Sequence, residues 1–263
     1  MTTVAPAAPT EGDEARRHLR WWREVLYVAA FYLVYSFVRN QFGSAAVSEQ
    51  TAFDNARTII DAERALNLYV EESVQEAFLG WRWFIQAWNL YYGTFHFVVT
   101  AFAIVYCFRR LPNRYVRWRT TLACTTALAL IGFATFPLMP PRLLPVDYGY
   151  VDTLATYGGL WSFDSGAMKA VSNQYAAMPS LHFGWSTWCA LVLAPAVRRP
   201  WLRALVIAYP LATLFAIVVT GNHFWLDAAG GALVLALGYL LGVAWDRRTR
   251  ARRAQRAAAQ KTV

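Results

Sequence analysis

The sequence predicts an all-α, polytopic membrane protein: a six-transmembrane-helix bundle with an interfacial helix and a loop on its extracytoplasmic side. The chain of 263 residues is 57% hydrophobic. Its apolar residues gather in runs close to the roughly 20 residues that a helix needs to cross a bilayer. Its basic residues crowd into alternate connections between those runs. We expect spans over residues 24–39, 83–108, 118–138, 182–197, 201–220 and 227–245.

The basic residues predict the orientation. Cytoplasmic connections of membrane proteins are rich in Lys and Arg, and with the N-terminus inside, 19 of the 25 basic residues fall on the cytoplasmic side. We therefore expect a multi-pass protein of the cell membrane with both termini in the cytoplasm. The net charge of +9 then indicates topology and contact with anionic lipid head groups, and it does not indicate a nucleic-acid partner.

The chain divides into three parts. Residues 1–20 are predicted to be a disordered basic N-terminus, residues 21–246 the six-helix membrane domain, and residues 247–263 a basic cytoplasmic tail. The first apolar run follows a strongly basic stretch, so we expect it to stay as an anchor and not to be a cleaved signal. The three cysteines lie in apolar runs without metal-ligand spacing, which argues against a disulfide framework or a zinc site.

Two segments are predicted to lie outside the membrane. Residues 55–78 are too charged to span, and their apolar positions recur at three- and four-residue steps, which predicts an amphipathic helix. This helix is expected on the outer membrane surface or across the mouth of the bundle, with Glu63 as an exception within its apolar stripe. The second segment, Met139–Ala177, opens with prolines that cannot continue a helix, and a loop of this length is often functional.

Two histidines are predicted to meet at the outer face. His182 starts the fourth span and His223, 41 positions later, ends the fifth, so both imidazoles reach the same side. Asp227 follows His223 by four residues and shares its helix face. A carboxylate on one imidazole nitrogen leaves the other as a nucleophile toward phosphorus. The pair alone is equally compatible with a structural contact at a helix entrance, and the addition of His182 favours catalysis.

Other polar residues on that face predict the remaining roles. His182 is suited to protonate a leaving group and later to deprotonate an acceptor. Ser180 and Asn222, within the same two motifs, are expected to bind phosphate oxygens. Arg142, just after the third span, is expected to offset transition-state charge, or else to anchor lipid phosphates only.

Asn89 and His96 form a further candidate pair in the second span. They are seven residues apart, so they share a helix face, and His96 lies in the outer half of the span. We expect either a substrate-binding role or a structural role in which the histidine bonds a neighbouring helix.

The two histidine motifs resemble those of the type 2 phosphatidic acid phosphatase superfamily. ProSerLeuHis at 179–182 and HisPheTrpLeuAsp at 223–227 match its second and third motifs. The resemblance covers roughly residues 89–231, and the two motifs in this order and at this spacing are specific.

The sequence departs from the common family pattern in two places. Ala216 and Ile217 stand where a Ser-Arg pair is usual, and ProProArg, with Thr135 in place of a lysine, replaces the usual first motif. The chain is in these respects similar to the inositol phosphorylceramide synthase-like branch, which consists of inositolphosphotransferases. The resemblance implies a six-helix bundle, no metal and no cofactor, with His223 as nucleophile, Asp227 as its partner and His182 as acid and base.

We therefore predict a lipid phosphotransferase that moves a phosphoryl or head-group phosphoryl, with phosphoinositol as one candidate, through a phosphohistidine. The donor is a lipid phosphate or phosphodiester, and the acceptor is an alcohol, a lipid or water. Hydrolysis by the same site is the alternative, because the motifs do not separate the two outcomes. A transporter with histidine proton relays is a third interpretation, which predicts mid-bilayer charges and paired half-helices that we do not find in the sequence.

Overall fold

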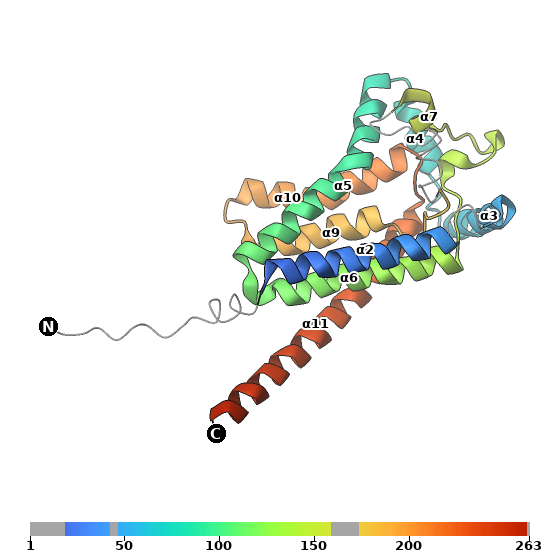
Figure 1. The fold of residues 1–263 in the computed structure, drawn as a ribbon. Coiled ribbons are helices and arrows are strands. Elements are labelled where there is room, and N and C mark those ends of the chain that lie inside the picture. The colour runs from blue at the N-terminus through green and yellow to red at the C-terminus, as the bar shows by residue number, and fades with distance from the viewer. Residues whose placement is uncertain (1–18, 43–46, 159–173, 262–263) are drawn as a thin grey trace.

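The computed structural model describes residues 19–42, 47–158 and 174–261, and these residues fold almost entirely into helices (Figure 1). The longer helices are α2 (Trp21–Phe42), α3 (Glu49–Ala65), α4 (Glu71–Leu79), α5 (Arg82–Arg110), α6 (Pro112–Thr135), α9 (Leu181–Leu193), α10 (Pro200–Val219) and α11 (Trp225–Lys261). Short helical turns are η1 (Pro141–Leu143), η2 (Val146–Tyr148), α7 (Thr153–Tyr157) and η3 (Ala194–Ala196). Over the described ranges the prediction of an all-α fold is confirmed. Residues 1–18, most of the segment predicted to be disordered, lie outside them.

Three of the described helices are long and apolar enough to cross a membrane. They are α5, α10 and the part of α11 from Trp225 to Arg252, which correspond to the second, fifth and sixth predicted spans. The first, third and fourth spans remain predictions. The fourth is shorter than expected, because α9 has 13 residues before the turn η3 begins at Ala194, a rise of about 20 Å.

The bundle has two chemically different ends. At one end the start of α2 meets the start of α6 through Glu24, which bonds Arg119 at 2.7 Å and Tyr115 at 3.1 Å. Arg250 of α11 also donates there to the carbonyl of Asn113, in the first turn of α6. At the other end α3, α4 and α7 gather where α9 and α11 begin (Figure 1).

Helix α11 packs closely on α6. A Cβ on Gly238 would lie 2.5 Å from Thr125 Oγ1 and 2.9 Å from the carbonyl oxygen of Thr121, both on α6. A glycine at this position therefore lets the two backbones approach, as small residues do between membrane helices. Helix α11 also continues beyond residue 246 without a break, so the basic tail extends the sixth predicted span as a helix through Lys261.

The segment predicted as one helix over 55–78 forms two helices. Helix α3 ends at Ala65, and α4 begins at Glu71. Between them Asn67 adopts a left-handed φ of 55°, a conformation that asparagine tolerates better than most residues. The Leu68 N–H then bonds the Glu63 carbonyl at 2.8 Å, which closes the end of α3.

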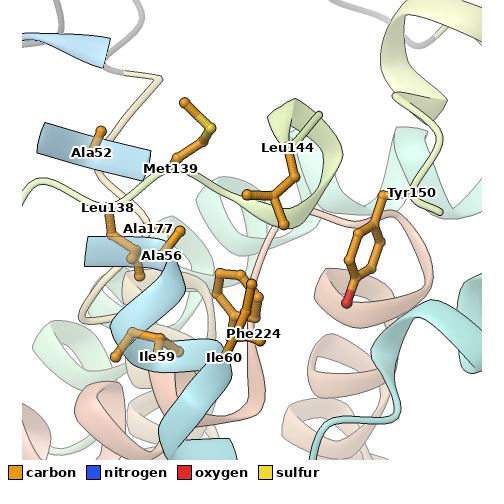
Figure 2. Close-up of a cluster of buried hydrophobic side chains, with 10 residues drawn as sticks. All are labelled: Ala52, Ala56, Ile59, Ile60, Leu138, Met139, Leu144, Tyr150, Ala177 and Phe224. Carbon is orange, nitrogen blue, oxygen red and sulfur yellow. The ribbon is translucent and has the colours of Figure 1, made fainter. Parts of the chain in front are cut away.

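Helix α3 lies across the end of the bundle. Its Ala56 and Ile60 are buried with Leu138, from the segment after α6, and Phe224, from the turn before α11 (Figure 2). The Met139 N–H also donates to the carbonyl of Ala52 at 3.1 Å. The apolar stripe of α3 is thus buried against protein, and this packing fixes α3 beside the start of α11.

Candidate active site

The turn before α11 brings His223 and Asp227 into contact. His223 Nδ1 lies 3.1 Å from Asp227 Oδ2, and the two residues are 3% and 0% exposed. The same carboxylate oxygen accepts the Phe224 N–H at 3.0 Å. Since a carboxylate accepts hydrogen bonds, the neutral ring of His223 carries its proton on Nδ1 and its lone pair on Nε2.

The free nitrogen of His223 faces the second predicted histidine. His223 Nε2 lies 3.4 Å from Nδ1 of His182, and the two ring centroids are 5.4 Å apart. His182 is the second residue of α9, whose first turn is capped by Ser180. The spacing of 41 residues thus brings the two imidazoles together, as the sequence predicts.

Helix α5 adds two rings to this pair. Tyr92 stacks on His182 with centroids 4.2 Å apart and an interplanar angle of 22°. The His96 ring lies at the same centroid distance from His182, and its Nδ1 donates to the Tyr92 carbonyl at 2.9 Å. The Nδ1 bond stays within α5 and is not the bond to a neighbouring helix that the structural interpretation expects. The position of the ring beside His182 is compatible with a substrate-binding role.

Arg142 lies against the other side of the same turn. Its backbone N–H donates to the Gly221 carbonyl at 2.8 Å, and its Nε donates to Asn222 Oδ1 at 3.0 Å. Its Nη1 pairs with Asp152 Oδ2 at 2.7 Å, with 8% of the Arg142 side chain exposed. Gly221 has a φ of +67° and would place a Cβ 3.3 Å from Arg142 Cβ, so both its conformation and the close approach favour glycine. The guanidinium is therefore held by two side chains, Asp152 and Asn222, of which Asn222 directly precedes His223 in the chain.

Replacing Arg142 with lysine is expected to lower kcat/KM for a lipid phosphate by about 100-fold. A lysine retains the charge but cannot reproduce the forked contacts to Asn222 and Asp152. The measurement is steady-state kinetics of the purified variant beside Arg57→Lys, an exposed arginine on α3. Equal kinetics of the two variants would contradict a phosphate-binding role for Arg142.

Two predicted phosphate- or substrate-binding residues have structural contacts here. The Ser180 hydroxyl caps α9 by accepting the Phe183 N–H at 3.4 Å, and its backbone N–H donates to the Asp227 carbonyl at 2.8 Å. The side-chain hydrogen bonds of Asn89 go to other groups than the described histidines. Its amide donates to the Thr153 and Gly158 carbonyls at 2.9 and 3.0 Å. Ser180 thus ties α9 to α11, and Asn89 holds the segment that contains Asp152.

Sequence reasoning missed Asp152 and Tyr92 as members of this site. Asp152 also accepts the Leu154 N–H at 3.1 Å as the N-cap of α7. Aspartate is a common N-cap residue, but nothing in the local sequence indicates that Asp152 pairs with Arg142. Ala216 and Ile217 are both 0% exposed, so the positions where the family commonly has Ser-Arg contribute apolar core in this chain.

Within the described ranges no set of three His, Cys, Asp or Glu side chains is arranged to hold a metal ion, and independence from metal stays a prediction. A sequence model of the PAP2 superfamily matches residues 57–241 of the chain. No curated protein and no solved structure matches the chain.

Proposed function

The chain belongs to the PAP2 superfamily, since the match over residues 57–241 spans well over half of its length, and we propose that it is an integral-membrane lipid phosphotransferase that works through a phosphohistidine. Membership in the superfamily suggests lipid phosphatase or phosphotransferase chemistry on a lipid phosphate in a membrane. The transfer reaction, the intermediate and the roles of individual residues are our proposal.

The surroundings of His223 are the main support for this proposal. Its Nδ1 is 3.1 Å from a buried carboxylate and its Nε2 is 3.4 Å from a second imidazole. A histidine oriented on one nitrogen and open at the other, with an acid and base beside it, has the arrangement that an activated nucleophile requires. The neighbouring Arg142 supplies a cation for phosphate oxygens.

In the first proposed step, His223 Nε2 attacks phosphorus and the bond from phosphorus to the leaving oxygen breaks. Protonated His182 gives its proton to that oxygen, and the released alcohol departs. The phosphoryl or head-group phosphoryl stays on Nε2. Asp227 stabilises the positive charge that the ring acquires, and Arg142 offsets negative charge on the non-bridging oxygens.

In the second step, an acceptor hydroxyl gives its proton to His182 and attacks phosphorus. The bond from phosphorus to Nε2 breaks, which restores His223 as a free imidazole and His182 in its protonated form. An alcohol acceptor gives a new phosphoester or phosphodiester, whereas water gives hydrolysis.

We favour transfer because Ala216 and Ile217 replace the usual Ser-Arg pair, as in the inositolphosphotransferase branch that the sequence resembles. We place the site on the extracytoplasmic side, from the distribution of basic residues.

The decisive experiment offers the purified protein a donor labelled in its phosphate, with and without a lipid alcohol as acceptor. Phosphatidate and phosphatidylinositol are the two donors. We expect labelled acceptor to form about tenfold faster than the water-derived product, a preference of about 1.4 kcal/mol. Release of free phosphate or head-group phosphate at a rate independent of acceptor would instead support the phosphatase alternative. No turnover of either donor would contradict both.

A further inference from the structure

Two buried glutamates outside the proposed mechanism contact the first turn of α11. Glu63 lies near the end of α3, Glu71 is the first residue of α4, and both are 0% exposed. Glu63 Oε1 accepts the Leu226 N–H at 2.8 Å, and Glu71 Oε1 accepts the Trp225 N–H at 3.1 Å. Backbone N–H groups at a helix start lack partners within the helix and carry partial positive charge. The two carboxyl groups satisfy these N–H groups from outside α11.

Three carboxyl groups thus bind three consecutive N–H groups of this turn. Asp227 Oδ2 accepts from Phe224 and from His223 Nδ1, while Glu71 and Glu63 take the next two N–H groups. The Asp227 side chain that orients His223 is therefore held in a turn that both glutamates fix. A displacement of this turn would move the Asp227 carboxylate relative to the imidazole.

The two glutamates also act on each other. Oε2 of Glu63 and Oε2 of Glu71 are both buried and find no hydrogen-bond partner among the described residues, and a hydrogen bond to Glu71 is one of the causes that raise the pKa of Glu63. Two ionised carboxylates cannot form such a bond, so one of the pair must carry a proton. Burial first, and then the bond to Glu71, raises the pKa of Glu63 to about 9. None of the ion pairs between described residues includes either glutamate.

Among the described residues, the groups that act on the Glu63 carboxyl include no positive charge. Asp227 of α11 lies close enough to disfavour a second negative charge on Glu63. Tyr69, from the turn between α3 and α4, and Tyr150, from the segment before α7, are the other titratable neighbours, and burial raises the pKa of both. The charge of Arg64 lowers the pKa of Tyr69, and the charge of Glu72 raises it. These neighbours therefore favour a pair in which Glu63 and Glu71 share one proton near neutral pH.

We propose that Glu63 and Glu71, joined by one proton, are positioning residues that fix the first turn of α11 and so hold Asp227 against His223. The proposal rests on the function proposed above. Loss of the shared proton places a second negative charge beside Asp227, and repulsion between the carboxylates then loosens the turn.

The proposal has a defined pH dependence. The pKa of Glu63 is raised from its ordinary 4.5 to about 9, so between these values the folded protein keeps a proton that the unfolded chain has released. Stability from the pair is therefore complete below about pH 4.5, declines as pH rises through this window, and is lost above about pH 9. Turnover is expected to fall as Glu63 loses its proton near pH 9.

The variant Glu63→Gln tests the shared proton. Its amide oxygen can still accept the Leu226 N–H, and its NH₂ group donates to Glu71 at every pH. We expect kcat at pH 7 within threefold of the wild type, and an alkaline loss of activity at least one pH unit above that of the wild type. Glu63→Ala removes the acceptor and should lower kcat at least tenfold. The matched control is Glu76→Gln on an exposed site of α4, which should keep the wild-type pH profile.

A second readout needs no turnover. Hydrogen-exchange protection of the Trp225 and Leu226 amides, corrected for intrinsic rates, should fall above pH 9 in the wild type and in Glu76→Gln, and should persist in Glu63→Gln. Identical pH profiles of activity and protection in Glu63→Gln and the wild type would overturn the proposal. The expected protection pattern without turnover in any of the proteins would instead contradict the proposed function while leaving the shared proton supported.

Discussion

Replacing His223 with alanine is expected to reduce turnover of a lipid phosphate by at least about 10³-fold, because loss of a covalent nucleophile removes the reaction path itself. The ring is 3% exposed and lies 3.1 Å from Asp227. Its removal therefore leaves a cavity and a buried carboxylate with one partner fewer. We expect some loss of stability, of about 1–3 kcal/mol, from the unpaired acceptor.

Rapid quenching after mixing with labelled donor measures the effect. The wild type should trap acid-labile, base-stable label on the protein, and His223→Ala should trap none. Circular dichroism and gel filtration check that the variant is folded. His18→Ala, in the part of the chain before the described residues, is the matched control and should turn over normally. Retained turnover in folded His223→Ala would exclude His223 as the nucleophile.

Replacing Asp227 with asparagine is expected to lower kcat by about 10²- to 10⁴-fold with a much smaller change in KM. The Asp227 carboxylate holds the proton on His223 Nδ1 and stabilises the positive ring, as the aspartate of a Ser-His-Asp triad does. An amide oxygen can still accept the Phe224 N–H, so the turn is retained. The neutral amide cannot offset the positive charge on a phosphorylated imidazole, which is why kcat is affected more than KM.

Steady-state kinetics over several pH values, beside Asp61→Asn at an exposed site on α3, separates this effect from general damage. The control should match the wild type. A raised KM with unchanged kcat in Asp227→Asn would mean that Asp227 contributes to uniform substrate binding and not to the chemical step.

Local patterns in the sequence predicted much of the fold. Hydropathy indicated the apolar segments that became α5, α10 and α11, because a helix of sufficient length and apolar composition is recognisable without its neighbours. The motif at 179–182 and the motif at 223–227 likewise indicated the superfamily. The spacing of four residues predicted the contact between His223 and Asp227, although His223 reaches Asp227 from the turn before α11 and not from within the helix.

Other features were not predictable from local pattern. Residues 55–78 had a continuous helical periodicity, yet Asn67 turns the chain there and leaves α3 and α4 as separate helices. The fourth predicted span became the 13-residue α9. Periodicity reports which face of a helix is apolar, but it does not report where tertiary contacts make a turn more stable than another turn of helix.

The sequence by itself determined the helical class, the superfamily and the set of His182, His223 and Asp227, since these depend on composition, spacing and short motifs. Only the tertiary structure decided which residues surround these three and hold them in place. Asp152 holds Arg142, and Glu63 binds the N–H of Leu226, 163 residues away in the chain. The ionisable Glu63 within an apolar stripe had no local explanation. Its partners are backbone groups at the start of a distant helix, which have no signature in residue type and exist as unpaired donors only once that helix has formed.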